Sequence, residues 1–142
     1  MTIPSYDEIA ENLSFLEDWE ERYGYVIQLG KSLPPMADAR KTEENRVQGC
    51  ASQVWLATNV GEGADPVIAF EGDSDALIVR GLVALALSVN SGKTASQIVA
   101  TDTFGMFDAL GLRAHLSSQR SNGLRSMVAR IRRDAEAALL RG

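Results

Sequence analysis

A block of sequence with strand periodicity, flanked on both sides by sequence with helical periodicity, constrains the fold of this chain most. From Val54 to Val60 more and less apolar residues alternate, as is typical of a half-buried strand. Two clusters of turn residues, 61–66 and 72–75, separate this run from two more short apolar runs, 67–70 and 76–79. Together these runs predict an antiparallel meander of three short strands.

Helical patterns lie before and after the strands. Ser5 and Glu8 have the spacing of a capping box, and apolar residues then recur at helical intervals as far as Leu16. Further helices are expected over 18–29, from 81 to 90, after a capping box at 94–97, around 104–110, and from near 121 to the C-terminal end. We therefore expect a single α+β domain over residues 1–142, in which helices pack on one face of a small three-stranded antiparallel sheet and also form both termini.

Length and charge limit the classes of function. A chain of 142 residues with 45% hydrophobic and 23% charged residues is typical of one soluble globular domain. The net charge of −5 argues against a nucleic-acid partner, because Lys and Arg must neutralise phosphates. Residues 1–16 lack the positive start of a secretory signal, and the densest apolar stretch, 82–89, is too short to cross a bilayer. We expect a cytoplasmic protein that does not bind membranes.

Cys50 is the single cysteine, and it lies just before the first predicted strand. Gly49 allows a sharp backbone bend there, and Ser52 follows with a hydroxyl that can donate to an anionic sulfur. One thiol cannot form an internal disulfide or a cysteine-based metal site, so any chemistry at this sulfur involves another molecule. A free cysteine is also often an inert, buried, small hydrophobic residue, and the spacing alone leaves both interpretations open.

Several reactive roles can be compared for this thiol. A disulfide oxidoreductase would normally have C-x-x-C, which is absent, and a cysteine hydrolase would need His115, the single histidine, as its base. A sulfur carrier needs only one thiol, because its thiolate attacks a donor persulfide as in thiol–disulfide exchange and the product is reversible. A redox-sensing or thiol-reactive protein and a binding module with an inert cysteine are the alternatives.

The segment Val47–Leu56 resembles the signature of the SufE family, whose members accept sulfur from a cysteine desulfurase for iron–sulfur cluster assembly. Three more segments, 19–34, 73–82 and 110–124, resemble the family in the same order along the chain. The sequence departs from the family pattern at a few positions, where Ala51 replaces a glutamine, Ser118-Gln119 replaces Pro-Ser, and Asn90 replaces an aromatic residue.

The resemblance implies a SufE/IscU-like fold with Cys50 as the persulfide acceptor on a loop. It implies a SufS-type cysteine desulfurase as donor and a SufB-type scaffold complex as recipient, and it leaves a homodimer open. The pyridoxal phosphate would belong to the desulfurase, so this chain is expected to bind no cofactor. With one cysteine and one histidine it is also expected to hold no cluster or metal by itself. It would act as a carrier and activator rather than as a stand-alone enzyme.

Five charged or polar residues are candidates for supporting roles around this thiol. If the start of the last helix packs beside the cysteine, Arg120 and Asn122 would steady a thiolate or dock the desulfurase; otherwise Ser121 or Asn122 simply caps that helix.

Asp73 and Asp75 would orient the adjacent loop or contact the partner, and their alternative role is turn formation. Arg46, four residues before Cys50, would favour the thiolate or contact the partner.

Overall fold

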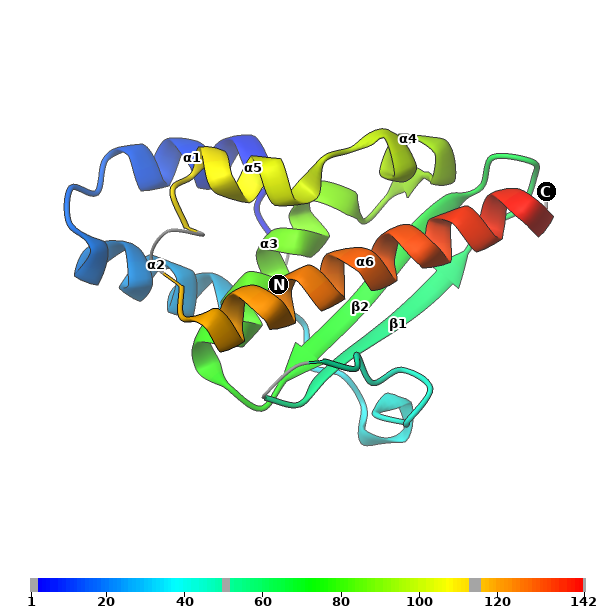
Figure 1. The fold of residues 1–142 in the computed structure, drawn as a ribbon, viewed down its shortest axis with the longest axis horizontal. Helices are drawn as coiled ribbons and strands as arrows, with labels where there is room; N and C mark the ends of the chain where they lie inside the picture. Colours follow the sequence, from blue (N-terminus) through cyan, green and yellow to red (C-terminus); the bar gives the residue numbers. More distant parts are fainter. Residues whose placement is uncertain (1–2, 50–51, 113–115, 142) are drawn as a thin grey trace.

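A computed structural model describes residues 3–49, 52–112 and 116–141, and it confirms the α+β class (Figure 1). The antiparallel sheet has the order β1-β2-β3, formed by β1 (Val54–Val60), β2 (Val67–Ser74) and β3 (Lys93–Thr94). Strands β1 and β2 pair along their whole length, with Val54 opposite Ser74 and Val60 opposite Ile68. Helices lie at both ends of the chain, as expected.

The first two helices begin where the sequence places their caps. In α1 (Tyr6–Ser14) the Ser5 hydroxyl accepts a hydrogen bond from the Glu8 N–H at 3.2 Å. In α2 (Trp19–Lys31) the Asp18 carboxylate accepts from the Glu21 N–H at 2.8 Å. A side-chain acceptor at this position satisfies one of the free N–H groups of the first turn. Both helices then bury one apolar face in the core, formed by Ile9, Leu13, Val26 and Leu29.

The third strand is not where the sequence predicts it. Residues 76–79 form the start of α3 (Leu77–Asn90), and the strand is instead the two-residue β3, which pairs with Val67 and Ile68. Strand β2 continues through the predicted turn as far as Ser74, so the apolar run that follows starts a buried helix rather than returning along the sheet. Because α3 connects β2 to β3, the sheet is not a simple meander.

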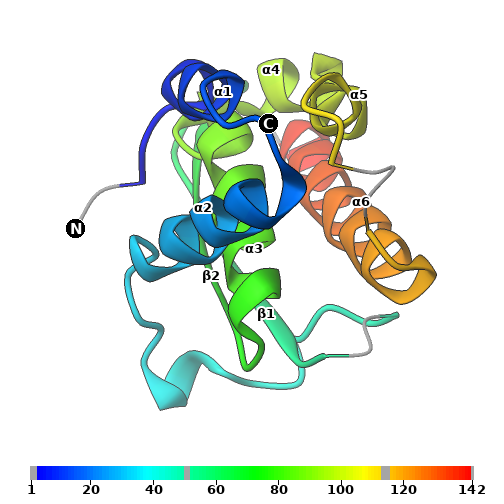
Figure 2. The ribbon, with the colours of Figure 1, turned by 90° about the vertical axis from the view of Figure 1, so that its left-hand side faces the viewer.

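Helices α4 (Ala95–Ala100), α5 (Thr103–Ala109) and α6 (Ser118–Arg141) complete the chain. The capping box before α4 is confirmed, since the Thr94 hydroxyl and the Gln97 side chain each accept a backbone N–H of the other residue, at 3.3 and 3.0 Å. Helix α6 begins earlier than predicted, at Ser118, and Ser117 caps it by accepting the Arg120 N–H at 3.2 Å. Figure 2 shows α6 on one side of α3, and α1 and α2 on the other.

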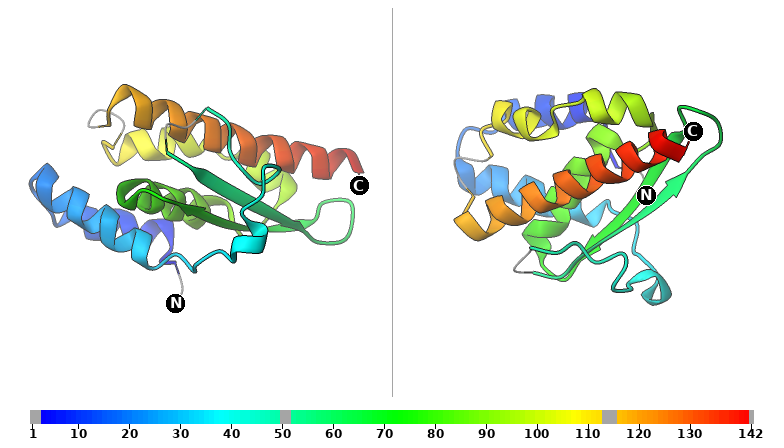
Figure 3. Two further views of the ribbon diagram at one scale, coloured as in Figure 1. Left: turned by 90° about the horizontal axis from the view of Figure 1, so that it is seen from below. Right: turned by 45° about the vertical axis from the view of Figure 1, so that its right-hand side comes forward.

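The outer face of the sheet is covered in part, around Trp55 and Asp73, by the segment between α2 and β1, which contains the short helix η1 (Asp38–Arg40). In both views of Figure 3, η1 lies on the opposite side of the strands from α6. The Met36 N–H donates to the Asp73 carboxylate at 3.4 Å, and the Lys41 ammonium lies 5.1 Å from the centre of the Trp55 ring. These contacts explain why Asp73 and Ala57, which belong to the outer face, are buried.

Among the helices of the described ranges, none combines the length and apolar character needed to cross a membrane.

Candidate functional site

Backbone hydrogen bonds join the two ends of the segment that contains Cys50, the predicted persulfide acceptor. The Val47 N–H donates to the Val54 carbonyl at 2.8 Å, and the Leu56 N–H donates to the Asn45 carbonyl at 2.7 Å. Residues 44–47, here called the arm, therefore run antiparallel to β1, with Arg46 opposite Trp55. Residues 48–53, here called the cysteine loop, connect the arm to β1. Cys50 itself lies outside the described residues, as do Ala51 and His115, while Gly49 and Ser52 are described.

One side of the cysteine loop rests on helix α6. Gly49 has a φ of +89°, a left-handed conformation that residues with side chains rarely adopt. A Cβ at this position would lie 2.6 Å from the Ser126 hydroxyl oxygen, which would have to rotate away, so the positive φ is the main reason for glycine here. The glycine predicted to bend the chain therefore also sets how the loop packs.

A pocket of about 310 Å³ lies between the cysteine loop, α3 and the start of α6. Ser52 and Arg120, two of the predicted supporting residues, both line it. Asn122, a third, is exposed on α6 and is not among the lining residues. The wall is both apolar and polar, and its remaining residues are Val54, Val79, Leu82, Ser117, Gln119, Gly123, Leu124 and Met127.

The helix start gives this pocket a positive potential. The first turn of an α-helix carries N–H groups that have no partner within the helix, and the helix dipole adds a partial positive charge there. Ser117 and Gln119, at this end of α6, line the pocket together with the guanidinium-bearing Arg120. Such surroundings favour an anion, including a thiolate or a persulfide anion. The condition stated for Arg120 is thus met, because the start of the last helix does pack beside the cysteine loop.

Asp75 lies at the C-terminal end of the cysteine loop, where it contacts Gln53. Its carboxylate accepts the Gln53 N–H at 3.1 Å, and its own N–H donates to the Gln53 carbonyl at 3.3 Å. This geometry supports the predicted role of Asp75 in orienting the loop.

Asp73 has a different environment. Its side chain is only 4% exposed, it forms an ion pair with Arg80, and it lies 3.4 Å from the Lys41 ammonium. Arg80 also donates to the carbonyls of Gly30 and Leu33 at 3.3 and 3.2 Å. The Asp73 carboxylate therefore joins β2, the start of α3 and the end of α2 inside the fold.

Arg46 lies on the other flank of the loop. It lines a groove of about 420 Å³ with Gln48, Ser126 and Arg133, and its side chain is 38% exposed and lies 3.5 Å from Glu43. Arg46 is therefore not part of the pocket that Ser52 and Arg120 share. It remains a candidate for contact with a partner.

Three residues of the site were not predicted: Ser117, Ser126 and Arg130. Ser117 could have been found as one of several serines that precede the last helix. Ser126 and Arg130 have no sequence signal, because they meet the loop and the arm only through the tertiary fold; Arg130 donates to the Glu44 carbonyl at 3.0 Å. Within the residues that the structure describes, no three metal-ligating side chains lie together.

Comparisons with known proteins identify the family and the fold. Residues 7–135 match the sequence model of a family described as SufE, Fe-S metabolism associated domain. An uncharacterized SufE-like protein of Rhizobium etli is 59% identical over 133 residues, which cover 93% of this chain and 90% of the relative. Another from Rhizobium meliloti is 56% identical over 136 residues, which cover 95% and 97%. The solution structure of a hypothetical protein from Thermus thermophilus has the same fold, with a TM-score of 0.74, 20% identity and 99% of each chain covered.

Proposed function

Because the chain belongs to the SufE family, we propose that Cys50 accepts sulfur from a cysteine desulfurase and passes it on for iron–sulfur cluster assembly. The SufE domain suggests a role in iron–sulfur metabolism, and the family implies a cysteine desulfurase as partner. The observation that carries the proposal is the pocket shared by Ser52 and Arg120. It brings the positive start of α6 beside the residues that flank the single cysteine.

The proposed transfer is an exchange between sulfur atoms. The Cys50 thiolate attacks the outer sulfur of a persulfide on the donor's cysteine, so that a new S–S bond forms and the donor's S–S bond breaks. The electron pair of the broken bond leaves with the donor's cysteine as a thiolate. The outer sulfur keeps its oxidation state, so no external oxidant or reductant is needed. The product is a persulfide on Cys50, which the same kind of step passes to the next thiolate.

The described residues have separate tasks in this step. Arg120 and the first turn of α6 supply the positive potential that favours a sulfur anion at the pocket. Val79, Leu82 and Leu124 form an apolar wall that screens a sulfur entering the pocket from water and from other thiols. Gly49 lets the loop lie against α6 without an intervening side chain.

The other participants are inferred from membership of the SufE family. The pyridoxal phosphate belongs to the donor, which is of the SufS type, and a SufB-type scaffold complex receives the sulfur. One chain with one thiol is sufficient for the exchange. The reducing cytoplasm, which keeps a lone thiol free, is the compartment that suits it.

Intact mass after incubation with a cysteine desulfurase and free cysteine tests this proposal directly. Since Cys50 is the single cysteine, wild type should gain one sulfur atom that a reductant removes, and Cys50→Ser should gain none. Wild type should also raise the turnover of the desulfurase. Arg120→Gln should slow sulfur gain, whereas Arg132→Gln, which removes an equal charge from the same helix outside the pocket, should not.

Two results would contradict the proposal. One is a Cys50→Ser variant that stimulates the desulfurase as well as wild type does. The other is oxygen addition at Cys50 by peroxide with no sulfur gain from the desulfurase, which would favour the redox-sensing alternative.

A further inference from the structure

Arg130 connects the arm to the rest of the fold through a chain of hydrogen bonds. Its Nη2 donates to the Glu44 carbonyl at 3.0 Å, and its Nε lies 3.2 and 3.3 Å from the two carboxylate oxygens of Asp134. The Thr58 hydroxyl donates to the same carboxylate at 2.7 Å. These hydrogen bonds therefore connect β1 to the arm through two residues of α6, Asp134 and Arg130.

The charged side chains in this set of hydrogen bonds are largely withdrawn from solvent. The Arg130 and Asp134 side chains are 16% and 21% exposed. Water and salt weaken ion pairs least where the pair is withdrawn from solvent, and hydrogen bonds that involve charged groups are stronger than those between neutral ones. Asp134 lies one helical turn after Arg130, so it fixes the plane of the guanidinium and directs the outer nitrogen at Glu44.

A second contact of the same helix face lies closer to the cysteine. Ser126 precedes Arg130 by one helical turn, and it is the residue against which Gly49 packs. Arg130 therefore holds the base of the arm at Glu44, while Ser126 supports the loop next to Cys50. Together these two contacts hold Glu44 and Gly49 against α6.

We propose that Arg130 is a positioning residue for sulfur transfer, which holds the arm on α6 and so sets the position from which the cysteine loop departs. This inference rests on the proposed function. Without Arg130 the arm loses its hydrogen bond to α6 and is held by its bonds to β1 alone, so it opens away from the fold more often. Apparent affinity for the donor then falls with the fraction of molecules whose arm remains on α6.

Hydrogen exchange of the full chain tests the positioning role without any partner. In Arg130→Met the amides of Arg46 and Val47, which donate to the Glu43 and Val54 carbonyls, should exchange about tenfold faster because the arm opens more often. Amides of α3 should exchange as in wild type. Arg130→Lys should restore part of the protection, because it retains a charged donor. Arg133→Met is the matched control: Arg133 lines the same groove but has no hydrogen bond or ion pair with the described residues, and its loss should leave exchange unchanged.

Desulfurase stimulation supplies the functional readout. The concentration of Arg130→Met needed for half-maximal stimulation should rise about tenfold, while the maximal rate stays near that of wild type. Unchanged exchange at Arg46 and Val47, equal acceleration in α3, or a lower maximal rate with unchanged half-saturation would each overturn the positioning role. A wild type that stimulates no desulfurase would instead overturn the proposed function, and the exchange data would still decide whether Arg130 holds the arm.

Discussion

Asp75 and Gln53 bond to each other twice, once through the Asp75 carboxylate at 3.1 Å and once through the Asp75 N–H at 3.3 Å. Gln53 is the last residue of the cysteine loop, and Asp75 lies in the turn that leads from β2 into α3. The loop is therefore attached at this end to the sheet–helix junction, and at the other end to α6 through Gly49 and Arg130.

Replacing Asp75 by alanine should loosen the C-terminal end of the loop. The Gln53 N–H loses its acceptor, so its exchange should accelerate and the free energy of unfolding should fall by about 0.5–1.5 kcal/mol. Hydrogen exchange and urea denaturation measure the two effects. Asp75→Asn retains an acceptor oxygen and should stay close to wild type, so an asparagine variant as loose as the alanine variant would contradict this role.

Asp73 and Glu71, two residues apart in β2, should respond very differently to loss of charge. Asp73→Asn leaves Arg80 without its buried partner and should cost about 3–5 kcal/mol of unfolding free energy. Glu71→Gln breaks a surface pair with Arg40, whose side chains are 50% and 43% exposed, and should cost less than about 1 kcal/mol. Equal losses in urea titrations would mean that Asp73 is not the buried link described above.

The cap of α6 can be located by a pair of alanine variants. Ser117→Ala removes the acceptor of the Arg120 N–H and should cost about 1 kcal/mol, and Ser117→Asp should restore it. Asn122→Ala should have little effect, because Asn122 lies within the helix rather than at its cap. Thermal or urea unfolding distinguishes the two positions, and a larger loss at Asn122 would favour the later helix start that the sequence suggests.

Asp65 should make the stability depend on acid pH. Hydrogen bonds from the Ser96 hydroxyl and N–H lower the pKa of its carboxyl below the ordinary value. The stabilisation of the fold by the charged Asp65 carboxylate is fully present above the ordinary pKa, near pH 4, and is lost as the pH falls through the lowered pKa. The difference in unfolding free energy between wild type and Asp65→Asn should therefore be constant near neutrality and shrink below about pH 4. A difference that persists unchanged at lower pH would show that the carboxylate charge contributes nothing.

Local signals in the sequence were sufficient for most of the fold. The Ser5 and Thr94 caps are formed as their spacing predicts, because a cap involves residues only a few positions apart. The apolar run at 76–79 misled because its residues suit a strand or a helix equally well. They form the partly exposed start of α3, whose buried residues begin at Gly81 and which packs against α2 and β2. The two-residue β3 is too short to carry a periodic pattern of its own.

The site was predictable to the extent that it depends on residue chemistry. Gly49, Ser52 and Arg120 were chosen for what they can do near a thiolate, and the fold brings all three to the loop and its pocket. Asp73 carries the same charge as Asp75, and only the fold turns one inward and the other toward the loop. The contact between Arg130 and Glu44 joins residues 86 positions apart, which no spacing rule detects.

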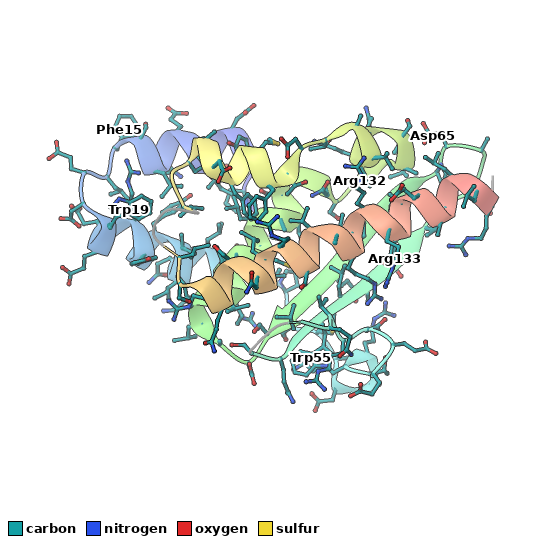
Figure 4. The ribbon with its side chains drawn as sticks, in the orientation of Figure 1. Phe15, Trp19, Trp55, Asp65, Arg132 and Arg133 are labelled. Carbon is teal, nitrogen blue, oxygen red and sulfur yellow. The ribbon has the colours of Figure 1, made fainter. Side chains whose placement is uncertain are left out.

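Figure 4 shows Arg132 and Arg133 on opposite edges of α6, and Arg133 on the edge that faces the strands and Trp55. Arg133 lines the groove beside the arm, and Arg132 does not. Replacement of Arg132 is therefore the control for Arg120, and replacement of Arg133 is the control for Arg130.

The bond from Val47 to Val54 closes six residues into a unit with fixed end points. We expect loops of the same length from other members of the family to be exchangeable between these two positions, provided that the contacts of Gly49 with Ser126 and of Gln53 with Asp75 are kept. Chimaeras of this kind would separate what the loop itself encodes about the choice of donor from what the surrounding scaffold encodes.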